Sequence, residues 1–281
     1  MGSVVLAVTL AAGCGGSDTP SSADEPSGGI TTTTAGGTIT SSSTTASTAP
    51  PLTRPDWLGT RVLPEGAPPP PTPPELDPRV LPTVDALPPP ADGAFHASVT
   101  PVPADVAARS TWQPGCPVAL EELRYATVTF RGFDGAAHTG ELIVHRDAAE
   151  GVTGIFERLF AAGYPIEEMR IATRADLDAP DTGDGNATTG FVCRPTRGQS
   201  SWSQHAYGRA IDVNPFQNPY VRDGTDVIPG LATSYLDRSD MRPGMILPGD
   251  RTVTTFGDLG WQWGGTWANP VDHMHFSANG R

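Results

Sequence analysis

Residues 203–212 read SQHAYGRAID, and a second motif, DHMH, occupies residues 272–275 near the C-terminal end. Together the motifs supply two imidazoles, from His205 and His275, and the carboxylate of Asp212. Such a set can hold one zinc ion while one coordination position stays open to water. Asp272 lies three residues before His275, where a group that transfers protons would be useful. The two motifs therefore indicate a metal-dependent hydrolase.

Both motifs resemble those of the zinc D,D-peptidases of bacterial cell walls, the D-alanyl-D-alanine carboxypeptidases and L-alanyl-D-glutamate endopeptidases. The family pattern is Ser-x-His-x-x-Gly-x-Ala-x-Asp, followed later by an acid, two residues and a histidine. The positions that match it are Ser203, His205, Gly208, Ala210, Asp212, Asp272 and His275. The resemblance extends from about Phe191 to the C-terminus, and it implies an α+β fold of the hedgehog/D,D-peptidase type, with a small antiparallel sheet and flanking helices.

This resemblance implies a role for each motif residue. His205, Asp212 and His275 would bind one zinc ion, and Asp272 would act first as general base and then as general acid. His273 forms a His-x-His pair with His275, but the family leaves this position variable. Many relatives end in Glu-x-Trp-His, whereas this chain has Asp-His-Met-His, which is closer to the endopeptidases. The bond that is cut in peptidoglycan stem peptides therefore stays open between the two types.

Further site residues are expected around the motifs. Family members place an arginine before the first ligand to orient a substrate carboxylate or stabilise the oxyanion, and Arg194 is the first candidate, with Arg197 as the alternative. Ser203 is expected to orient the His205 loop or a substrate group. Among the aromatic residues, Tyr207 and Trp267 are the best candidates to line a substrate groove.

Two other classes of protein fit part of this pattern. Two histidines and a carboxylate also bind ferrous iron in oxygenases, but those sites usually have a His-x-Asp/Glu spacing. The domain could also be a non-catalytic, zinc-stabilised module that binds the cell wall. All residues of the expected catalytic set are present, which favours the peptidase.

Residues 101–281 are predicted to form the folded zinc domain. Residues 123–130 and 140–145 are typical of strands and should form a hairpin, and a helix with Asp147 as N-cap should cover 148–162 and end at Gly163. Further strands are expected at 169–172, 191–194, 210–213, 262–267 and 274–277, with a polar loop over 176–189 and a helix over 252–259. This mixed order indicates an α+β domain.

Residues 15–100 differ sharply from the domain in composition. Ser, Thr, Gly and Ala predominate up to Ala49, and 15 of the 41 residues from Pro50 to Pro90 are proline. We predict disorder for the first part, because it lacks apolar residues to bury, and extended polyproline segments for the second. The whole of 15–100 would then be a spacer in front of the domain.

Residues 1–14 form a short apolar run that ends in Cys14 and resembles a bacterial lipoprotein signal. We expect lipidation of Cys14, which would place the domain outside the cytoplasmic membrane, facing the cell wall; a plain secretory signal is the alternative. Cys116 and Cys193 then remain as an even pair, as expected for a disulfide in an oxidising compartment. The alternative for either cysteine is a metal ligand or a nucleophile.

The charge of the chain restricts its partners. A formal net charge of −13 and a pI near 4.7 argue against electrostatic binding to nucleic acid. The expected partners are peptidoglycan peptides as substrate and a membrane through the lipid on Cys14. The protein is expected to be a monomer.

Overall fold

The computed structural model describes residues 53–280. The predicted signal segment 1–14, its Cys14 and the first part of the predicted spacer lie outside the described residues. Within 53–280, none of the helices has the length and apolar character needed to cross a membrane.

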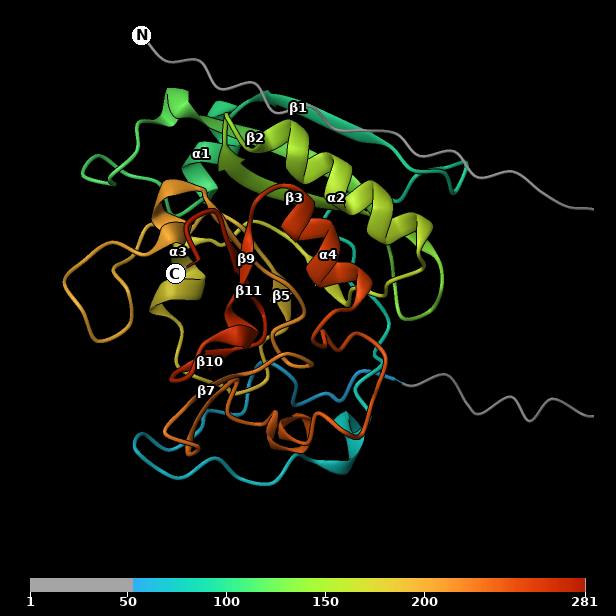
Figure 1. The fold of residues 1–281 in the computed structure, drawn as a ribbon, viewed down its shortest axis with the longest axis vertical. Helices are drawn as coiled ribbons and strands as arrows, with labels where there is room; N and C mark the ends of the chain where they lie inside the picture. Colours follow the sequence, from blue (N-terminus) through green and yellow to red (C-terminus); the bar gives the residue numbers. More distant parts are fainter. Residues whose placement is uncertain (1–52, 281) are drawn as a thin grey trace, which may run out of the picture. The chain divides into compact units, whose positions relative to one another are not determined.

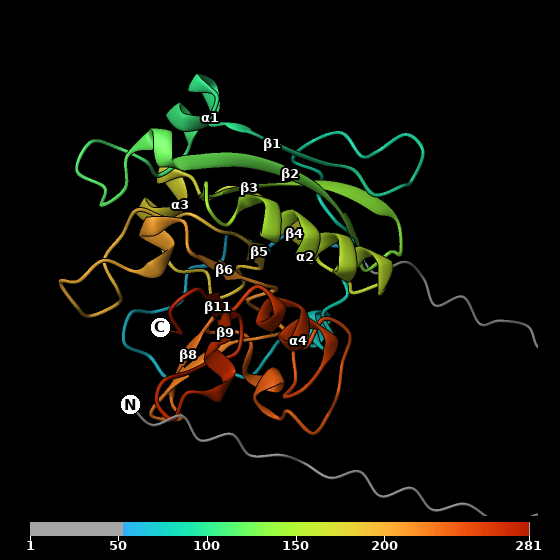
Figure 2. The same ribbon diagram turned by 45° about the horizontal axis from the view of Figure 1, so that its top comes forward.

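An antiparallel sheet covered by a long helix forms one layer of the domain (Figures 1 and 2). The sheet contains β1 (Ala97–Pro101), β2 (Leu123–Arg131) and β3 (Ala137–His145), in that order. Helix α2 (Ala149–Ala161) packs on it through Val152, Ile155, Phe156 and Leu159, which recur at the spacing of one helical face. The predicted hairpin and helix are confirmed.

The sequence predicted the C-terminal end of α2 correctly but not the cap at its N-terminal end. Gly163 has a φ of 69° and closes the helix, as expected. The predicted cap at the other end is wrong: Ala148 occupies the N-cap position, and no side chain caps the helix there. The Asp147 carboxylate instead accepts a hydrogen bond from Arg209, at 3.0 Å.

Two further antiparallel sheets and one parallel pair form the other layer. Strand β11 (His275–Ser277) lies between β6 (Ala210–Asp212) and β9 (Gln262–Trp263). Strand β7 (Tyr220–Arg222) lies between β10 (Val271–Asp272) and β8 (Asp226–Ile228). The remaining elements are α1 (Ala104–Arg109), α3 (Arg174–Asp178), α4 (Arg251–Asp258) and the parallel pair β4 (Glu168–Met169) and β5 (Ala187–Thr188).

This α+β architecture agrees with the predicted class, with the antiparallel strands divided among three sheets instead of one. Several predicted elements need correction. Residues 191–194 are not a strand, and the expected polar loop at 176–189 contains the end of α3 and all of β5. The helix α4 and the strands β6, β9 and β11 lie where the sequence placed them, although β9 is only two residues long.

The Pro-rich segment from Thr53 to Pro90 packs against the domain, which corrects the predicted spacer for this part of 15–100. Leu76 and Leu81 are fully buried against Phe216 and Tyr235. Strand β1 also begins inside the range 15–100 that was predicted to be a spacer. A few apolar side chains among the prolines are enough to hold the segment, because the domain offers a matching apolar surface.

A buried ion pair fixes the same segment. The Arg79 guanidinium donates two hydrogen bonds of 2.7 Å to the Glu167 carboxylate and a third, also 2.7 Å, to the carbonyl oxygen of Asp184. Asn186 donates to the same carboxylate. The Arg79 side chain also lies over the ring of Phe216, 4.4 Å from its centre. Both charged groups are therefore satisfied inside the protein.

Candidate metal centre and its cleft

Strand pairing brings the two sequence motifs together. Strand β6 ends at Asp212 and pairs with β11, which begins at His275, so that these two residues face each other across the sheet. His205 comes from the short 3-10 helix Gln204–Tyr207, which Ser203 caps by accepting a hydrogen bond from the His205 backbone N–H. The first motif thus forms a capped turn followed by a buried strand.

Gly208 allows this turn to sit close to the sheet above it. Its φ of 66° lies in the left-handed region, and a Cβ atom there would be 2.5 Å from the backbone nitrogen of His145. Its carbonyl oxygen accepts a hydrogen bond from that same N–H, at 2.8 Å. Only glycine combines this conformation with this approach.

Three candidate ligand atoms lie close enough together to hold one metal ion. His205 Nε2 lies 3.2 Å from His275 Nδ1 and 3.2 Å from Asp212 Oδ1, and His275 Nδ1 lies 3.0 Å from Asp212 Oδ1. A tetrahedral zinc with bonds of about 2.0–2.1 Å has ligand atoms about 3.3–3.4 Å apart. The three atoms therefore form nearly one face of such a tetrahedron, and its fourth corner remains for water or substrate.

The backbone fixes the orientation of the first ligand. His205 Nδ1 lies 2.6 Å from the carbonyl oxygen of Gly190. A proton on Nδ1 that is donated to this carbonyl leaves the Nε2 lone pair free for a metal. Both histidines are buried, so their rings have little freedom to turn away.

The pKa values of Asp212 and Asp272 are shifted in opposite directions. Burial by itself would raise the pKa of Asp212, but His205 and His275 hold it well below its usual range, so this carboxylate is ionised. Burial raises the pKa of Asp272 to about 7; His275 and Arg194 oppose the shift, and the Asp212 carboxylate adds to it. A cation between the ligands would lower the pKa of Asp272. The buried Asp272 carboxyl, beside the candidate ligands, is therefore a candidate for proton exchange.

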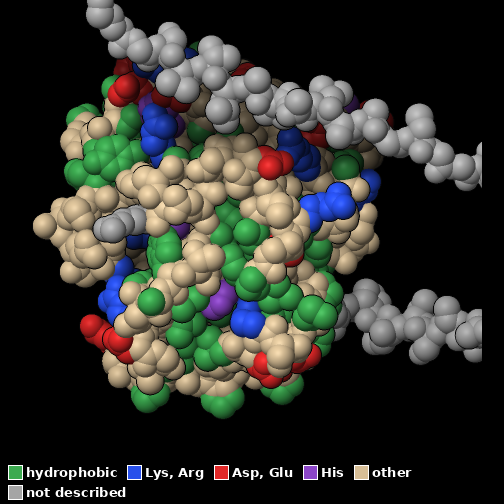
Figure 3. Space-filling view, in the orientation of Figure 1, with side chains coloured by type: hydrophobic (Ala, Val, Ile, Leu, Met, Phe, Trp, Pro, Cys, Tyr) green, Lys and Arg blue, Asp and Glu red, His purple; other side chains and the backbone are tan. Residues whose placement is uncertain are grey.

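The three ligands and Asp272 open into a cleft of about 1490 Å³. Ser203, Arg194, Arg197 and Trp267 line it, in agreement with their predicted positions near the site. The ring centre of Trp267 lies 5.4 Å from that of His275. On the face drawn in Figure 3, hydrophobic side chains gather at the centre and most charged side chains lie toward the edges.

The structure also shows where Tyr207 and His273 lie relative to the cleft and the candidate ligands. Tyr207 does not line the cleft, which corrects its expected place in a substrate groove. His273 Nδ1 faces the carbonyl oxygen of Pro219 at 3.0 Å, and His273 is not part of the ligand cluster. Residues 273–274 form a bend between β10 and β11, so His273 and His275 do not belong to the same strand.

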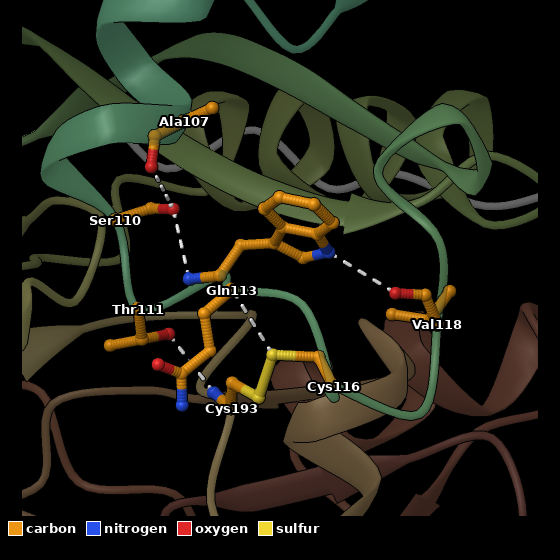
Figure 4. Close-up of a disulfide and its surroundings, with 8 residues drawn as sticks. Ala107, Ser110, Thr111, Gln113, Cys116, Val118 and Cys193 are labelled. Atoms are coloured by element: carbon orange, nitrogen blue, oxygen red, sulfur yellow. Dashed lines mark hydrogen bonds between the residues drawn. A yellow bond between two sulfur atoms is a disulfide. The ribbon is translucent and has the colours of Figure 1, made fainter.

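A disulfide holds the chain just before Arg194 (Figure 4). Cys193 is bonded to Cys116, as predicted, and its backbone N–H donates to the Thr111 hydroxyl at 2.9 Å. The segment around Cys116 is itself tied down, since the Trp112 indole N–H donates to the Val118 carbonyl oxygen at 3.1 Å. The backbone that carries Arg194 into the cleft lining is therefore held in place by the residue before it, Cys193.

Some cleft residues were not predicted. Arg54 and Leu58 of the Pro-rich segment line the cleft, and so do Thr189 and Tyr220. Gly190 was not predicted either. It contacts His205 through its backbone carbonyl oxygen, which the residue type does not reveal. Tyr220 had one signal in the sequence, since it follows the first motif by only eight residues.

Residues 196–278 match a family described as D-alanyl-D-alanine carboxypeptidase. This segment contains the three candidate ligands and Asp272, and the match supports the family resemblance that the motifs indicated. Arg194 and the Pro-rich segment lie outside the matched residues. Neither the curated proteins nor the solved structures give a significant match to the chain.

Proposed function

We propose that this protein is a zinc peptidase that hydrolyses peptide bonds in peptidoglycan stem peptides. The observation that carries the proposal is the triangle of candidate ligand atoms of His205, Asp212 and His275, with edges of 3.0–3.2 Å. Asp272 lines the same cleft, and its Oδ1 has no hydrogen-bond partner among residues 53–280. The match of residues 196–278 to a family described as D-alanyl-D-alanine carboxypeptidase supports the same chemistry.

When bound, zinc would act as a Lewis acid that polarises the scissile carbonyl and acidifies the attacking water. The protein residues then have separate tasks. Asp272 accepts the proton of that water and later donates it to the leaving amine, because its carboxyl lines the cleft together with the candidate ligands. Arg194 supplies a positive charge at the edge of the cleft, for a substrate carboxylate or for the oxyanion.

The proposal includes a location outside the cytoplasmic membrane, which the lipoprotein-like residues 1–14 support. A lipid on Cys14 would hold the protein at the outer face of the cytoplasmic membrane, where peptidoglycan is accessible and the Cys116–Cys193 disulfide is stable. A monomer is sufficient for this function, because one chain supplies every residue of the site.

The test is incubation of the full chain with muropeptides, with and without a chelator, followed by mass analysis of the products. Loss of a terminal residue identifies a carboxypeptidase, and separation of the peptide after its first residue identifies an endopeptidase. Activity should disappear with the chelator and return with added zinc. Product formation that the chelator leaves unchanged would overturn the zinc mechanism.

Asp272→Asn separates a peptidase from a zinc-stabilised wall-binding module. Asparagine keeps the shape of the side chain and cannot act as a base, so the variant should keep its zinc and lose hydrolysis by about 10²–10⁴-fold. A module without catalytic function would bind wall peptides equally well in both forms and hydrolyse none.

A further inference from the structure

Strands β10, β7 and β8 present one face to the cleft. Tyr220 and Arg222 of β7 line the cleft, whereas Val221, which lies between them, does not. The neighbouring strands contribute Asp272 and Ile228 to the same lining. Because side chains alternate along a strand, this lining is one face of the small sheet formed by β10, β7 and β8.

Tyr220 is the direct neighbour of Asp272 on this face. The two residues are partners in the antiparallel pairing of β7 and β10. Side chains in such a pair start about 4.5–5.5 Å apart at their Cβ atoms and point the same way. The phenol of Tyr220 is therefore directed into the cleft next to the proposed general base.

The Tyr220 hydroxyl oxygen is buried but has no hydrogen-bond partner among residues 53–280. A buried hydroxyl without a partner costs free energy, and such groups are rare in folded proteins unless a ligand satisfies them. One carboxylate oxygen of Asp272, Oδ1, is in the same state. Two unsatisfied polar atoms on adjacent residues in a cleft point to a ligand that supplies partners for both.

We propose that Tyr220 is a substrate-binding residue, whose hydroxyl donates a hydrogen bond to a peptide carbonyl oxygen beside the bond that is cut. This inference rests on the proposed function, because it needs a peptide in the cleft. Burial raises the pKa of the Tyr220 hydroxyl, although the Arg222 guanidinium on the same face opposes the shift, so the group stays protonated and can donate. A neutral carbonyl suits it better than a carboxylate, which the neighbouring charge of Asp272 would repel.

Tyr220→Phe removes the hydroxyl and keeps the ring. We expect kcat/KM for muropeptide hydrolysis to fall about tenfold, with unchanged zinc content. The melting temperature should not fall, because the hydroxyl has no partner to lose in the free protein. Tyr164→Phe is the matched control: its hydroxyl donates to the carbonyl oxygen of Gly244 at 2.7 Å, away from the cleft, so it should lose stability and keep kcat/KM.

The possible outcomes separate this inference from the proposed function. If the wild-type protein hydrolyses muropeptides and Tyr220→Phe is as active, the assignment of Tyr220 is overturned and the peptidase stands. A fall in melting temperature that accounts for the loss of activity would also overturn it, because the hydroxyl would then be structural. If the wild-type protein fails to hydrolyse any muropeptide, the proposed function falls first.

The acceptor can be identified with a second substrate. A stem peptide with an amidated C-terminus has no terminal carboxylate but keeps its carbonyl groups. The tenfold effect of Tyr220→Phe should persist on this peptide. An effect that disappears with the carboxylate would contradict the assignment to a carbonyl.

Discussion

The guanidinium of Arg79 and the carboxylate of Glu167 form two parallel hydrogen bonds of 2.7 Å, although 88 positions separate the residues in the chain. The exposed fractions of the two residues are 1% and 0%. This pair joins the Pro-rich segment to the domain at the cleft that holds the candidate metal centre. The Pro-rich segment is thus part of the folded unit. Its contacts with the rest of the domain should contribute to the free energy of unfolding.

Arg79→Ala should lower the free energy of unfolding by about 3–5 kcal/mol, because it leaves the buried Glu167 carboxylate without its main partner. Urea unfolding at pH 7 measures this. Arg54→Ala is the matched control, since Arg54 contacts the same carboxylate at 3.3 Å and its side chain is 30% exposed. It should cost at most about 1 kcal/mol. Equal effects of the two variants would contradict the central role of Arg79.

Local patterns explain which parts of the fold the sequence predicted correctly. The β2–β3 hairpin and α2 have long periodic runs of apolar residues, and their neighbours in sequence are also their neighbours in space. The candidate metal ligands could be predicted because their residue types and spacing are chemically specific. These signals need no knowledge of distant contacts.

The parts that the sequence did not predict depend on distant partners. Leu76 and Arg79 stand among prolines, and their burial is decided by Phe216 and Glu167. Tyr220 belongs to a three-residue strand that follows a proline, and its position beside Asp272 comes only from the pairing of β7 with β10. Short elements of this kind carry too few residues for a periodic pattern.

The two histidines of the second motif should differ in metal binding. His275→Ala removes one corner of the ligand triangle and should lower zinc affinity by at least about 10²-fold. His273→Ala should keep full zinc stoichiometry, because the His273 ring faces the Pro219 carbonyl oxygen. Titration of zinc into the metal-free proteins measures both. Loss of zinc in the His273 variant would show that the cluster includes a fourth protein ligand.

Loss of the disulfide should affect both stability and catalysis. Cys116 and Cys193 are 77 positions apart, and a bridge that closes a loop of this length contributes about 2–5 kcal/mol. A Cys116→Ser/Cys193→Ser variant should lose this amount, and its kcat/KM should fall because Arg194 is no longer held at the cleft edge.

Reductant provides the control for the disulfide. It should lower the melting temperature of the wild-type protein and leave that of the double variant unchanged. If the double variant keeps wild-type kcat/KM, Arg194 does not need the bridge for its position.

The pH dependence of stability should carry a contribution from Glu141, a buried residue of β3. Tyr125 Oη donates to its carboxylate at 2.6 Å, and the Arg109 guanidinium donates to both oxygens. Burial by itself would raise the pKa of Glu141, but these hydrogen bonds hold it below its usual range. Because the folded pKa lies below the unfolded value of about 4.3, the ionised group stabilises the protein above that pH.

Glu141→Gln should therefore lower the free energy of unfolding by about 1–3 kcal/mol at pH 7. The difference from the wild-type protein should shrink as the pH falls through the folded pKa of Glu141, where the wild-type carboxyl becomes protonated and resembles the amide. Urea unfolding of both proteins between pH 3 and pH 7 measures this. A difference that stays constant over the whole range would mean that Glu141 acts through its shape and not through its charge.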